Sequence, residues 1–300
     1  MSIEVKNLFK YYGDQAAVKD VSFSVKSGEI VGFLGPNGAG KSTTMKVITG
    51  FISASGGTVK VCGKPVTVNS LDTRKLIGYL PEHNPLYLDM YVKEYLTFVG
   101  NIYKVPNIKD RVAEMIKKVG LDVEQNKKIG ALSKGYRQRV GLAQAIIHDP
   151  DVLILDEPTS GLDPNQLVEI RELIRSIGKE KTVMLSTHIM QEVEAICDRV
   201  IIINKGEIVA DDKAKDLQFD AQLQTVYVEF DGKITKTMLR KIDGVRKVEA
   251  VNDGWLLESV AEDDLRKRVA RFAQENNILL VTLKKEEKSL EEVFKNLTNK

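Results

Sequence analysis

The feature that most constrains the fold is a glycine-rich octet, GPNGAGKS at residues 35–42, which fits the pattern G-x-x-x-x-G-K-[ST]. The apolar run before it, 29–34, predicts a buried strand, and we expect a helix to begin near Lys41. A strand, a glycine-rich turn and a helix in this order open a βαβ unit. Such a unit predicts an α/β fold with a parallel sheet covered by helices.

The octet also carries chemistry. Glycines allow backbone N–H groups to turn inward around phosphate oxygens, and the following helix presents its positive end to an anion. Lys41 is expected to reach the β- and γ-phosphates, and Ser42 to offer a hydroxyl to Mg²⁺. The alternative is a glycine-rich turn that matches by accident, which the strand–helix context disfavours. The predicted nucleotide-binding residues here are Asn37, Gly38, Ala39, Gly40, Lys41, Ser42 and Thr43.

The chain up to about residue 210 continues this alternation. Residues 89–149 are predicted to be mostly helical, and one amphipathic helix is marked by apolar residues from Ile108 to Val119, followed by Gly120 as a cap. Strands are then predicted at 152–155, 182–186 and 199–204, with helices at 164–177 and 190–197. Strands separated by helices predict a parallel sheet.

Two carboxylates follow the apolar strand 152–155. Ligand sites of parallel sheets lie at the carboxyl ends of the strands, where Asp156 and Glu157 would stand. Asp156 is predicted to hold Mg²⁺ through its water shell, and Glu157 to polarise an attacking water as a general base. A strand that simply ends in solvated acids is the alternative. A phosphate-binding turn in the same chain makes that alternative less favourable.

A polar stretch at 212–223 predicts a domain boundary, so we expect one domain at 1–215 and a smaller one at 222–300. The smaller domain shows strands near 226–230, 245–251, 255–260 and 278–283, with Asn252-Asp253-Gly254 as a hairpin turn. Helices are predicted near 265–273 and at 290–297, the latter with a capping box of Ser289 and Glu292. The order β-α-β-β-α-β predicts a ferredoxin-like α+β fold.

Composition excludes several classes of protein. Lysine and arginine number 44 and aspartate and glutamate 42, a net charge of +2, and no basic motif interleaved with aromatics occurs, so no nucleic-acid partner is expected. The two cysteines, Cys62 and Cys197, cannot staple a secreted domain and are expected to be buried thiols. No apolar run reaches about 18 residues, so no transmembrane helix is predicted.

Further motifs resemble those of the ATP-binding cassette (ABC) family. The run LSKGYRQR at 132–139 resembles the LSGGQ signature, and SGLD at 160–163 is similar to the D-loop of that family. Ser186-Thr187-His188 is similar to its switch histidine, and Tyr12 to the aromatic that stacks on adenine. The resemblance covers residues 1 to about 210 and implies an ABC cassette with a helical subdomain at about 87–150.

The resemblance implies that the chain hydrolyses ATP with Mg²⁺ and pairs with a second cassette, most simply a copy of itself. Ser133, Gly135 and Tyr136 would contact the nucleotide of the partner cassette, and Asp163 would shape that site. His188 would contact the γ-phosphate, and Val18 joins Tyr12 as a nucleotide contact. Residues implied in catalysis are Glu157, His188 and Lys41, and those at the metal are Ser42, Asp156 and Glu82.

This chain departs from the family pattern at three positions. Lys134 replaces the first glycine of the signature and Tyr136 its glutamine, which we interpret as a subfamily variant. Glu82 stands where the family usually places a glutamine that contacts Mg²⁺ and senses the membrane partner. The hypothesis is that Glu82 keeps this role and changes Mg²⁺ affinity more than turnover.

Finer resemblances point to export. The ending 289–294 resembles that of ATPase subunits of ABC-2-type exporters, and 77–98 is similar to the ATPase subunit of the bacterial gliding-motility transporter. The implied partner is a separate transmembrane permease, which would dock beside Glu82 and residues 85–100 and hold the chain on the cytoplasmic face of the membrane. In that stretch Pro85, Leu86, Tyr87 and Leu88 offer apolar contact or pack internally.

Two other functions remain as alternatives. A soluble ABC ATPase of translation or DNA maintenance usually has two cassettes or long coiled coils, and neither pattern is present in this sequence. A regulatory module with an inactive cassette is disfavoured because Lys41, Asp156, Glu157 and His188 are all retained.

Overall fold

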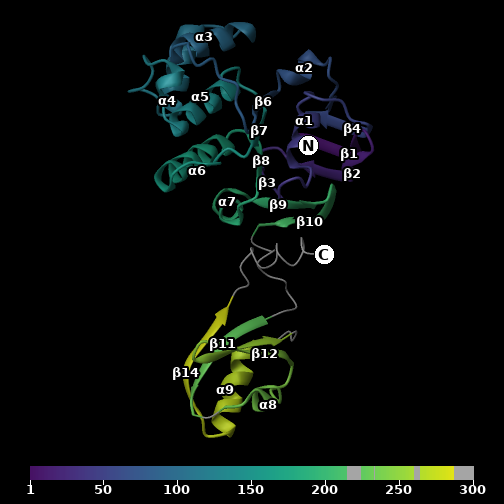
Figure 1. The fold of residues 1–300 in the computed structure, drawn as a ribbon, viewed down its shortest axis with the longest axis vertical. Helices are drawn as coiled ribbons and strands as arrows, with labels where there is room; N and C mark the ends of the chain where they lie inside the picture. Colours follow the sequence, from purple (N-terminus) through teal and green to yellow (C-terminus); the bar gives the residue numbers. More distant parts are fainter. Residues whose placement is uncertain (215–223, 233, 260–263, 287–300) are drawn as a thin grey trace. The chain divides into compact units, whose positions relative to one another are not determined.

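The computed structural model describes residues 1–214, 224–232, 234–259 and 264–286. The chain divides into two compact units, Met1–Ala214 and Lys215–Lys300 (Figure 1). Within the described residues, every helix is too short or too polar to cross a membrane.

The centre of the first unit is a six-stranded sheet in the order β10-β9-β3-β8-β7-β6. All neighbours in it are parallel except β10, which pairs antiparallel with β9. In register, Leu34 of β3 lies opposite Thr187 of β8, and Asp156 of β7 opposite Ser186. The carboxyl ends of β3, β7 and β8 therefore meet. The strands are β3 (Ile30–Leu34), β6 (Ile77–Leu80), β7 (Val152–Asp156), β8 (Thr182–Thr187), β9 (Arg199–Asn204) and β10 (Glu207–Lys213).

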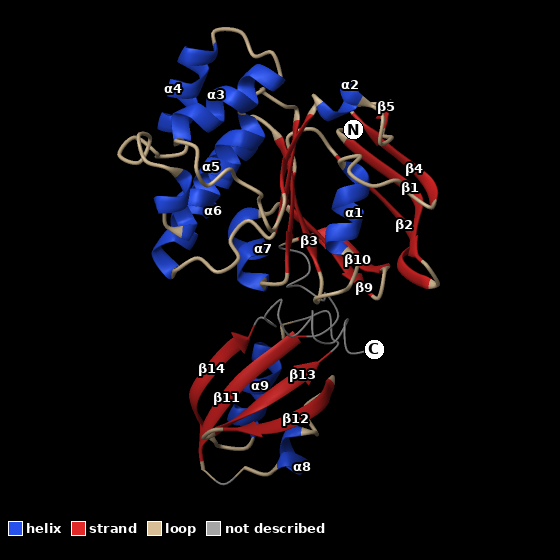
Figure 2. Ribbon diagram, turned by 45° about the horizontal axis from the view of Figure 1, so that its top comes forward, coloured by secondary structure: helices blue, strands red, loops and turns tan. Residues whose placement is uncertain are grey.

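A second, antiparallel sheet stands beside the first in the order β2-β1-β4-β5. Helix α1 (Lys41–Ile48) buries Met45 and Ile48 in a core shared with both sheets (Figure 2). This core anchors the helix that begins at the glycine-rich turn. The strands are β1 (Ile3–Tyr12), β2 (Gln15–Val25), β4 (Gly56–Val61) and β5 (Lys64–Pro65).

Helices α3 to α7 build a second apolar core against the six-stranded sheet, to which the short helix α2 contributes no residue. The predicted amphipathic helix is α4, which buries Val112, Met115 and Ile116 and is followed by Gly120 at φ +69°. The helices are α2 (Leu71–Arg74), α3 (Val92–Ile102), α4 (Ile108–Lys118), α5 (Lys134–Ile146), α6 (Pro164–Gly178) and α7 (Met190–Ile196), with a 3₁₀ turn at Ile129–Ala131.

The second unit is an antiparallel sheet in the order β12-β13-β11-β14, with helices α8 and α9. The β-α-β-β-α-β order of its elements confirms the predicted ferredoxin-like arrangement. Val226, Val228 and Leu257 lie in its core. The predicted helix 290–297 and its capping box lie outside the described residues. The elements are β11 (Gln224–Asp231), α8 (Lys236–Leu239), β12 (Val245–Val251), β13 (Gly254–Ser259), α9 (Leu265–Glu275) and β14 (Leu279–Glu286).

The prediction of a buried Cys62 is wrong. Cys62 and Gly63 form the two-residue turn between β4 and β5, with φ values of +49° and +77°. Both residues of such a turn project outward, so the Cys62 thiol is exposed. Cys197, which follows α7, is partly buried, and burial raises the pKa of its thiol.

Candidate functional site

At two positions of the turn between β3 and α1, the local structure leaves room for glycine alone. Gly40 has φ +108°, and a Cβ there would lie 2.6 Å from the carbonyl oxygen of Ala17. A Cβ on Gly35 would lie 2.4 Å from the carbonyl oxygen of Ile203. These glycines let the turn wrap closely onto its neighbours, so that backbone N–H groups and the start of α1 face the same space.

Lys41 is a buried cation at the first position of α1, only 6% exposed. Its ammonium donates to the carbonyl oxygens of Gly35 at 2.7 Å and Pro36 at 3.1 Å, and it lies 3.6 Å from Oε1 of Glu157. Burial lowers the pKa of Lys41, and the charges of Glu157 and Asp156 oppose that shift. A buried ammonium at a helix N-terminus is suited to an anion such as a phosphate.

Asp156, at the end of β7, collects hydroxyl groups from two other elements. Its Oδ1 accepts from Ser42 Oγ of α1 at 3.0 Å and from Ser186 Oγ of β8 at 2.6 Å. Oxygen donors of this kind fit Mg²⁺, which is usually bound by one or two carboxylates together with substrate phosphates and water. The described residues contain no cluster of three or more acidic, histidine or cysteine side chains that could hold a metal by themselves.

Glu157 and His188 form a contact pair beside Lys41. Glu157 Oε2 lies 2.9 Å from His188 Nδ1. Burial raises the pKa of Glu157, and the hydrogen bond and charge of His188 oppose that shift. The backbone of Glu157 has φ +49°, which costs about 1–3 kcal/mol for a residue other than glycine, and its N–H donates to Ser186 Oγ at 2.9 Å. A buried carboxylate with a raised pKa is suited to act as a base.

Lys41, Glu157 and His188 line a cavity of about 700 Å³ at the ends of β3, β7 and β8. Three lysines contribute to its wall, so the cavity suits an anionic ligand. Its lining residues are Gln15, Ala16, Ala17, Lys19, Asn37, Gly38, Gly40, Lys41, Ser42, Thr43, Glu82, Glu157, Ser160, His188 and Lys205.

Three predicted nucleotide contacts do not line this cavity. Val18 is fully buried in β2, and Ala39 is only 3% exposed. Tyr12 is half exposed at the hairpin between β1 and β2, with the ammonium of Lys10 5.2 Å from the centre of its ring. The roles predicted for these three residues stay predictions.

The signature residues also lie outside the cavity. Ser133 is the N-cap of α5 and accepts from the N–H of Tyr136 at 3.4 Å. Gly135 packs so closely on Gln166 that a Cβ would lie 2.5 Å from its side chain. Asp163 caps α6, and its Oδ1 accepts from two backbone N–H groups at 3.0 Å. Within one chain, therefore, the signature motif and the glycine-rich turn line different surfaces.

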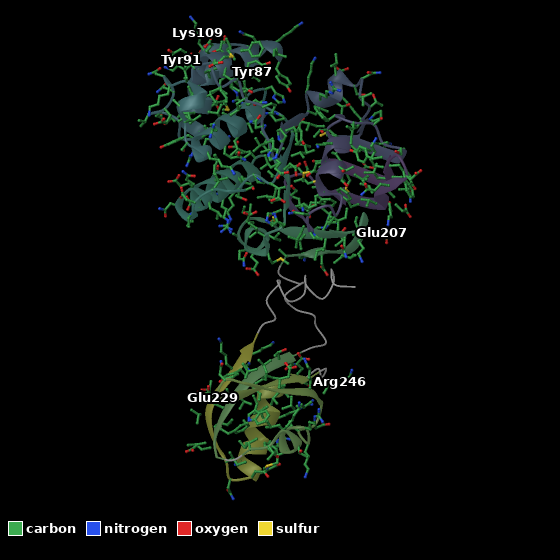
Figure 3. The ribbon with its side chains drawn as sticks, viewed as in Figure 1. Tyr87, Tyr91, Lys109, Glu207, Glu229 and Arg246 are labelled. Carbon is green, nitrogen blue, oxygen red and sulfur yellow. The ribbon has the colours of Figure 1, made fainter. Side chains whose placement is uncertain are left out.

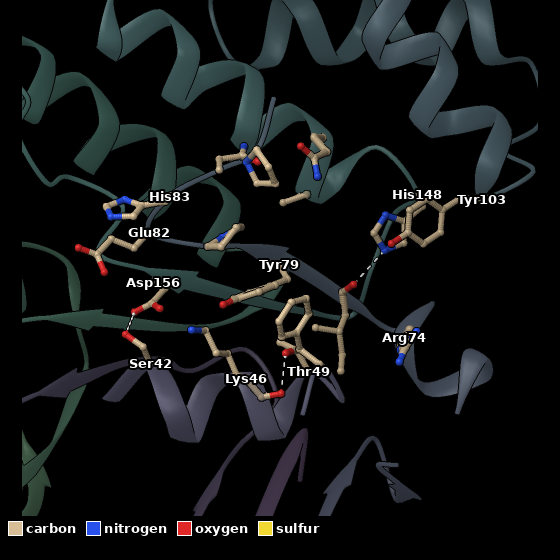
Figure 4. A pocket seen from close by; sticks show the side chains of 17 residues that line it. Ser42, Lys46, Thr49, Arg74, Tyr79, Glu82, His83, Tyr103, His148 and Asp156 are labelled. Carbon is tan, nitrogen blue, oxygen red and sulfur yellow. Dashed lines mark hydrogen bonds between the residues drawn. The ribbon is translucent and has the colours of Figure 1, made fainter. Parts of the chain in front are cut away.

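A second cavity of about 700 Å³ extends from Ser42, Glu82 and Asp156 to Tyr103 and His148 (Figure 4). At its far end Tyr103 stacks on His148, with ring centres 3.9 Å apart, and no motif in the sequence marks either residue. His148 Nε2 lies 3.1 Å from the carbonyl oxygen of Ile77, and burial lowers the pKa of His148 to about 4. His148 lies at the end of a stretch predicted to be helical, and nothing in that pattern predicts contact with Tyr103.

The glycine-rich turn, the buried lysine and the acidic end of β7 together define a P-loop nucleoside triphosphatase. Residues 18–160 match the model of the family described as ABC transporter. The chain is 40% identical over 212 residues to the Nod factor export ATP-binding protein I of Burkholderia orbicola (strain AU 1054), covering 70% of each chain. It is 34% identical over 309 residues to the linearmycin resistance ATP-binding protein LnrL of Bacillus subtilis (strain 168), covering 99% of this chain and 98% of that protein.

The fold of this chain is similar to solved structures of ABC transporter subunits. CbiO1 of Clostridium perfringens, part of the ABC transporter complex cbiONQ, has a TM-score of 0.67 at 30% identity, covering 73% of this chain and 91% of that one. A dimeric ATP-binding cassette in a post-hydrolysis state, bound to ADP and Pi, has a TM-score of 0.65 at 26% identity, covering 71% of this chain and 98% of that one. The chain belongs to the ATP-binding proteins of ABC transporters, and it is an ABC transporter ATPase.

Proposed function

We propose that this chain is the subunit that drives a separate export permease of the ABC-2 type by hydrolysing ATP between two copies of itself. The observation that carries the proposal is the buried pair of Lys41 and Glu157, with the more exposed His188 in contact with Glu157, at the converging ends of β3, β7 and β8. A regulatory module with an inactive cassette would have no need of buried charges held in contact in this way.

The roles of the residues follow from their contacts. Lys41 exchanges its carbonyl partners for the β- and γ-phosphates, since its ammonium is attracted more strongly to an ionised phosphate oxygen than to a neutral carbonyl oxygen. Glu157 polarises the attacking water, and His188 holds the carboxylate in place and contacts the γ-phosphate. Ser42 and Asp156, with Glu82 nearby, would hold Mg²⁺, which when bound neutralises phosphate charge.

A second copy completes the site. Ser133, Gly135, Tyr136 and Asp163 lie outside the cavity of their own chain, and Ser133 with the start of α5 presents a hydroxyl and a positive helix end. The dimeric cassette among the solved relatives supports a homodimer in which these residues cover the ATP of the partner. Tyr12 then stacks on adenine, and Val18, which is fully buried, packs behind Gly40 of the glycine-rich turn and supports the site from there.

The docking surface for the permease is proposed on the helical subdomain, about residues 87–150, around Tyr87 and the rings of Tyr95 and Phe98 that it contacts. We call this surface the aromatic edge. Tyr87 (Figure 3) is 55% exposed and Leu88 is 49% exposed, whereas Leu86 packs on the core. This edge adjoins the second cavity through Pro85, and that cavity reaches Glu82 and Asp156. A membrane subunit seated here would contact the region of the metal and hold the chain on the cytoplasmic face of the membrane.

Export as the direction of transport is supported by the relative named for Nod factor export. The link to gliding motility, which residues 77–98 suggest, stays a prediction.

The test uses tagged Glu157→Gln, which should bind ATP and hydrolyse it poorly, expressed in the native host and captured from detergent-solubilised membranes with ATP and Mg²⁺. Co-purification of a polytopic membrane protein is expected, and the identity of that protein narrows the cargo. A second capture with Tyr87→Asp should lose the partner. Val123→Asp, at a residue of the helical subdomain that is 84% exposed, is the matched control and should retain it. Capture of ribosomes or nucleic acid alone would favour the soluble ATPase and overturn the proposal.

A further inference from the structure

Glu192 is a fully buried carboxylate in α7, and it does not line the nucleotide cavity. An ionised side chain is rarely enclosed in a protein unless its oxygens are satisfied by hydrogen bonds. Both of its oxygens are satisfied here, and by hydroxyl groups from two different segments of the chain: Thr159 donates to Oε1 and Thr187 donates to Oε2.

The two threonines flank the catalytic pair in the sequence. Thr159 follows Glu157 by two residues in the turn after β7, and Thr187 directly precedes His188 at the end of β8. Thr159 is 2% exposed and Thr187 is fully buried. Thr187 Oγ1 also accepts from the N–H of Ile189 at 3.0 Å, which directs its own proton toward Glu192. One carboxylate thus joins the segment that carries Glu157 to the segment that carries His188.

The backbone at Glu157 needs such support. Its φ of +49° is a strained conformation for glutamate, and conformations of this kind persist only where the surroundings enforce them. The N–H of Glu157 is fixed by Ser186, and the turn after it is fixed through Thr159. Loosening either end would change the 2.9 Å contact between Glu157 and His188.

We propose that Glu192 is a positioning residue for ATP hydrolysis: through Thr159 and Thr187 it holds Glu157 and His188 in the contact that catalysis uses. It acts through these residues and touches neither nucleotide nor water. The inference rests on the roles proposed above for Glu157 and His188.

The experiment compares variants that change the hydrogen bonds and preserve the shape. Thr159→Val removes the hydroxyl with little change in volume, Thr159→Ser keeps it, and Glu192→Gln replaces the carboxylate by an amide with one acceptor oxygen. Purified full-length proteins are assayed for kcat, for the Kd of ATP and for the melting temperature. Thr159→Val and Glu192→Gln should each lower kcat at least about tenfold, as loss of supporting hydrogen bonds does at other sites. The Kd of ATP should change by less than about twofold, and Thr159→Ser should retain most of the wild-type kcat.

Glu157→Gln and His188→Ala are measured alongside. If these two lose turnover while Thr159→Val and Glu192→Gln keep kcat within about twofold of wild type, the positioning role is wrong and the roles of Glu157 and His188 stand. If Thr159→Ser loses as much as Thr159→Val, or if kcat, ATP binding and melting temperature fall together, Glu192 is merely structural and the inference is overturned. If Glu157→Gln and His188→Ala themselves retain turnover, the proposed function fails.

Discussion

The two units of the chain differ in whether they bury charged side chains. In Met1–Ala214, the side chains of Lys41, Asp156, Glu157 and Glu192 are all more than nine-tenths buried. In the described part of the second unit the buried polar residues are Thr225 and Ser259, neither of which is charged, and Glu229 remains partly exposed (Figure 3). Burying a charge costs free energy of folding, so the first unit is less stable than it could be at the residues of its site. The described part of the second unit carries no such cost.

The largest expected effect comes from removing the buried cation. Lys41→Ala should lower ATP turnover at least about 100-fold, because the phosphates lose a donor fixed at the start of α1. ATP hydrolysis and equilibrium ATP binding are both measured, and Lys26→Ala, at an exposed lysine of the same unit, serves as the control. Wild-type turnover in Lys41→Ala would contradict the assignment of the site.

His148 should make the first unit sensitive to acid. Its pKa is lowered to about 4 from 6.5 by burial, so the unfolded chain binds a proton more readily than the folded one, and stability falls as pH drops from about 6.5 to 4. The complete shift corresponds to at most about 3 kcal/mol. Thermal unfolding of wild type and His148→Gln between pH 7 and pH 4 tests this, and the variant should lose less stability. Equal slopes for the two proteins would show that His148 is not the cause.

Glu82→Gln should change the response to Mg²⁺ more than the maximal rate. Removing one exposed negative charge near the proposed metal site should raise the Mg²⁺ concentration for half-maximal hydrolysis about fivefold, equivalent to ~1 kcal/mol. Mg²⁺ titrations of ATP hydrolysis measure the effect. An unchanged Mg²⁺ dependence with turnover abolished would place Glu82 in the chemical step instead.

The smallest effect is expected in the second unit. Glu229 accepts hydrogen bonds from Tyr227 and Thr282 on the sheet, and the bond from Tyr227 is the main cause of its lowered pKa. Glu229→Gln should leave ATP hydrolysis by the isolated protein unchanged, since the group lies on a partly exposed sheet surface. A clear loss of turnover would show that the second unit takes part in catalysis, and the contrast between the units would fail.

The core of the site could be predicted because its residues follow strands directly. The octet after β3, the carboxylates at the end of β7 and His188 after β8 are all placed by the register of a parallel sheet. The order of elements in the second unit could be predicted for a similar reason, since each strand and its turn have a local signal.

The contacts that support the site could not be predicted. Glu192 lies in a short helix, where a glutamate is typically exposed, and no pattern marks it or Thr159. Thr187 belongs to the motif of the switch histidine, but that motif does not predict a bond to Glu192. The Tyr103–His148 stack joins residues 45 positions apart, which no periodicity reports. Cys62 was expected to be buried because it follows a predicted strand and free thiols are usually buried, but the geometry of a two-residue turn decided its exposure.

The central claim is that ATP is held between two copies of this chain and that Glu157 polarises the water which hydrolyses it. Its most direct test is the molar mass of Glu157→Gln by light scattering, with ATP and Mg²⁺ and with ADP and Mg²⁺, together with its rate of hydrolysis. The account predicts twice the mass of one chain with ATP, a single chain with ADP, and turnover lowered at least about 100-fold. A protein that stays monomeric with ATP, or that hydrolyses it at the wild-type rate, would contradict the account.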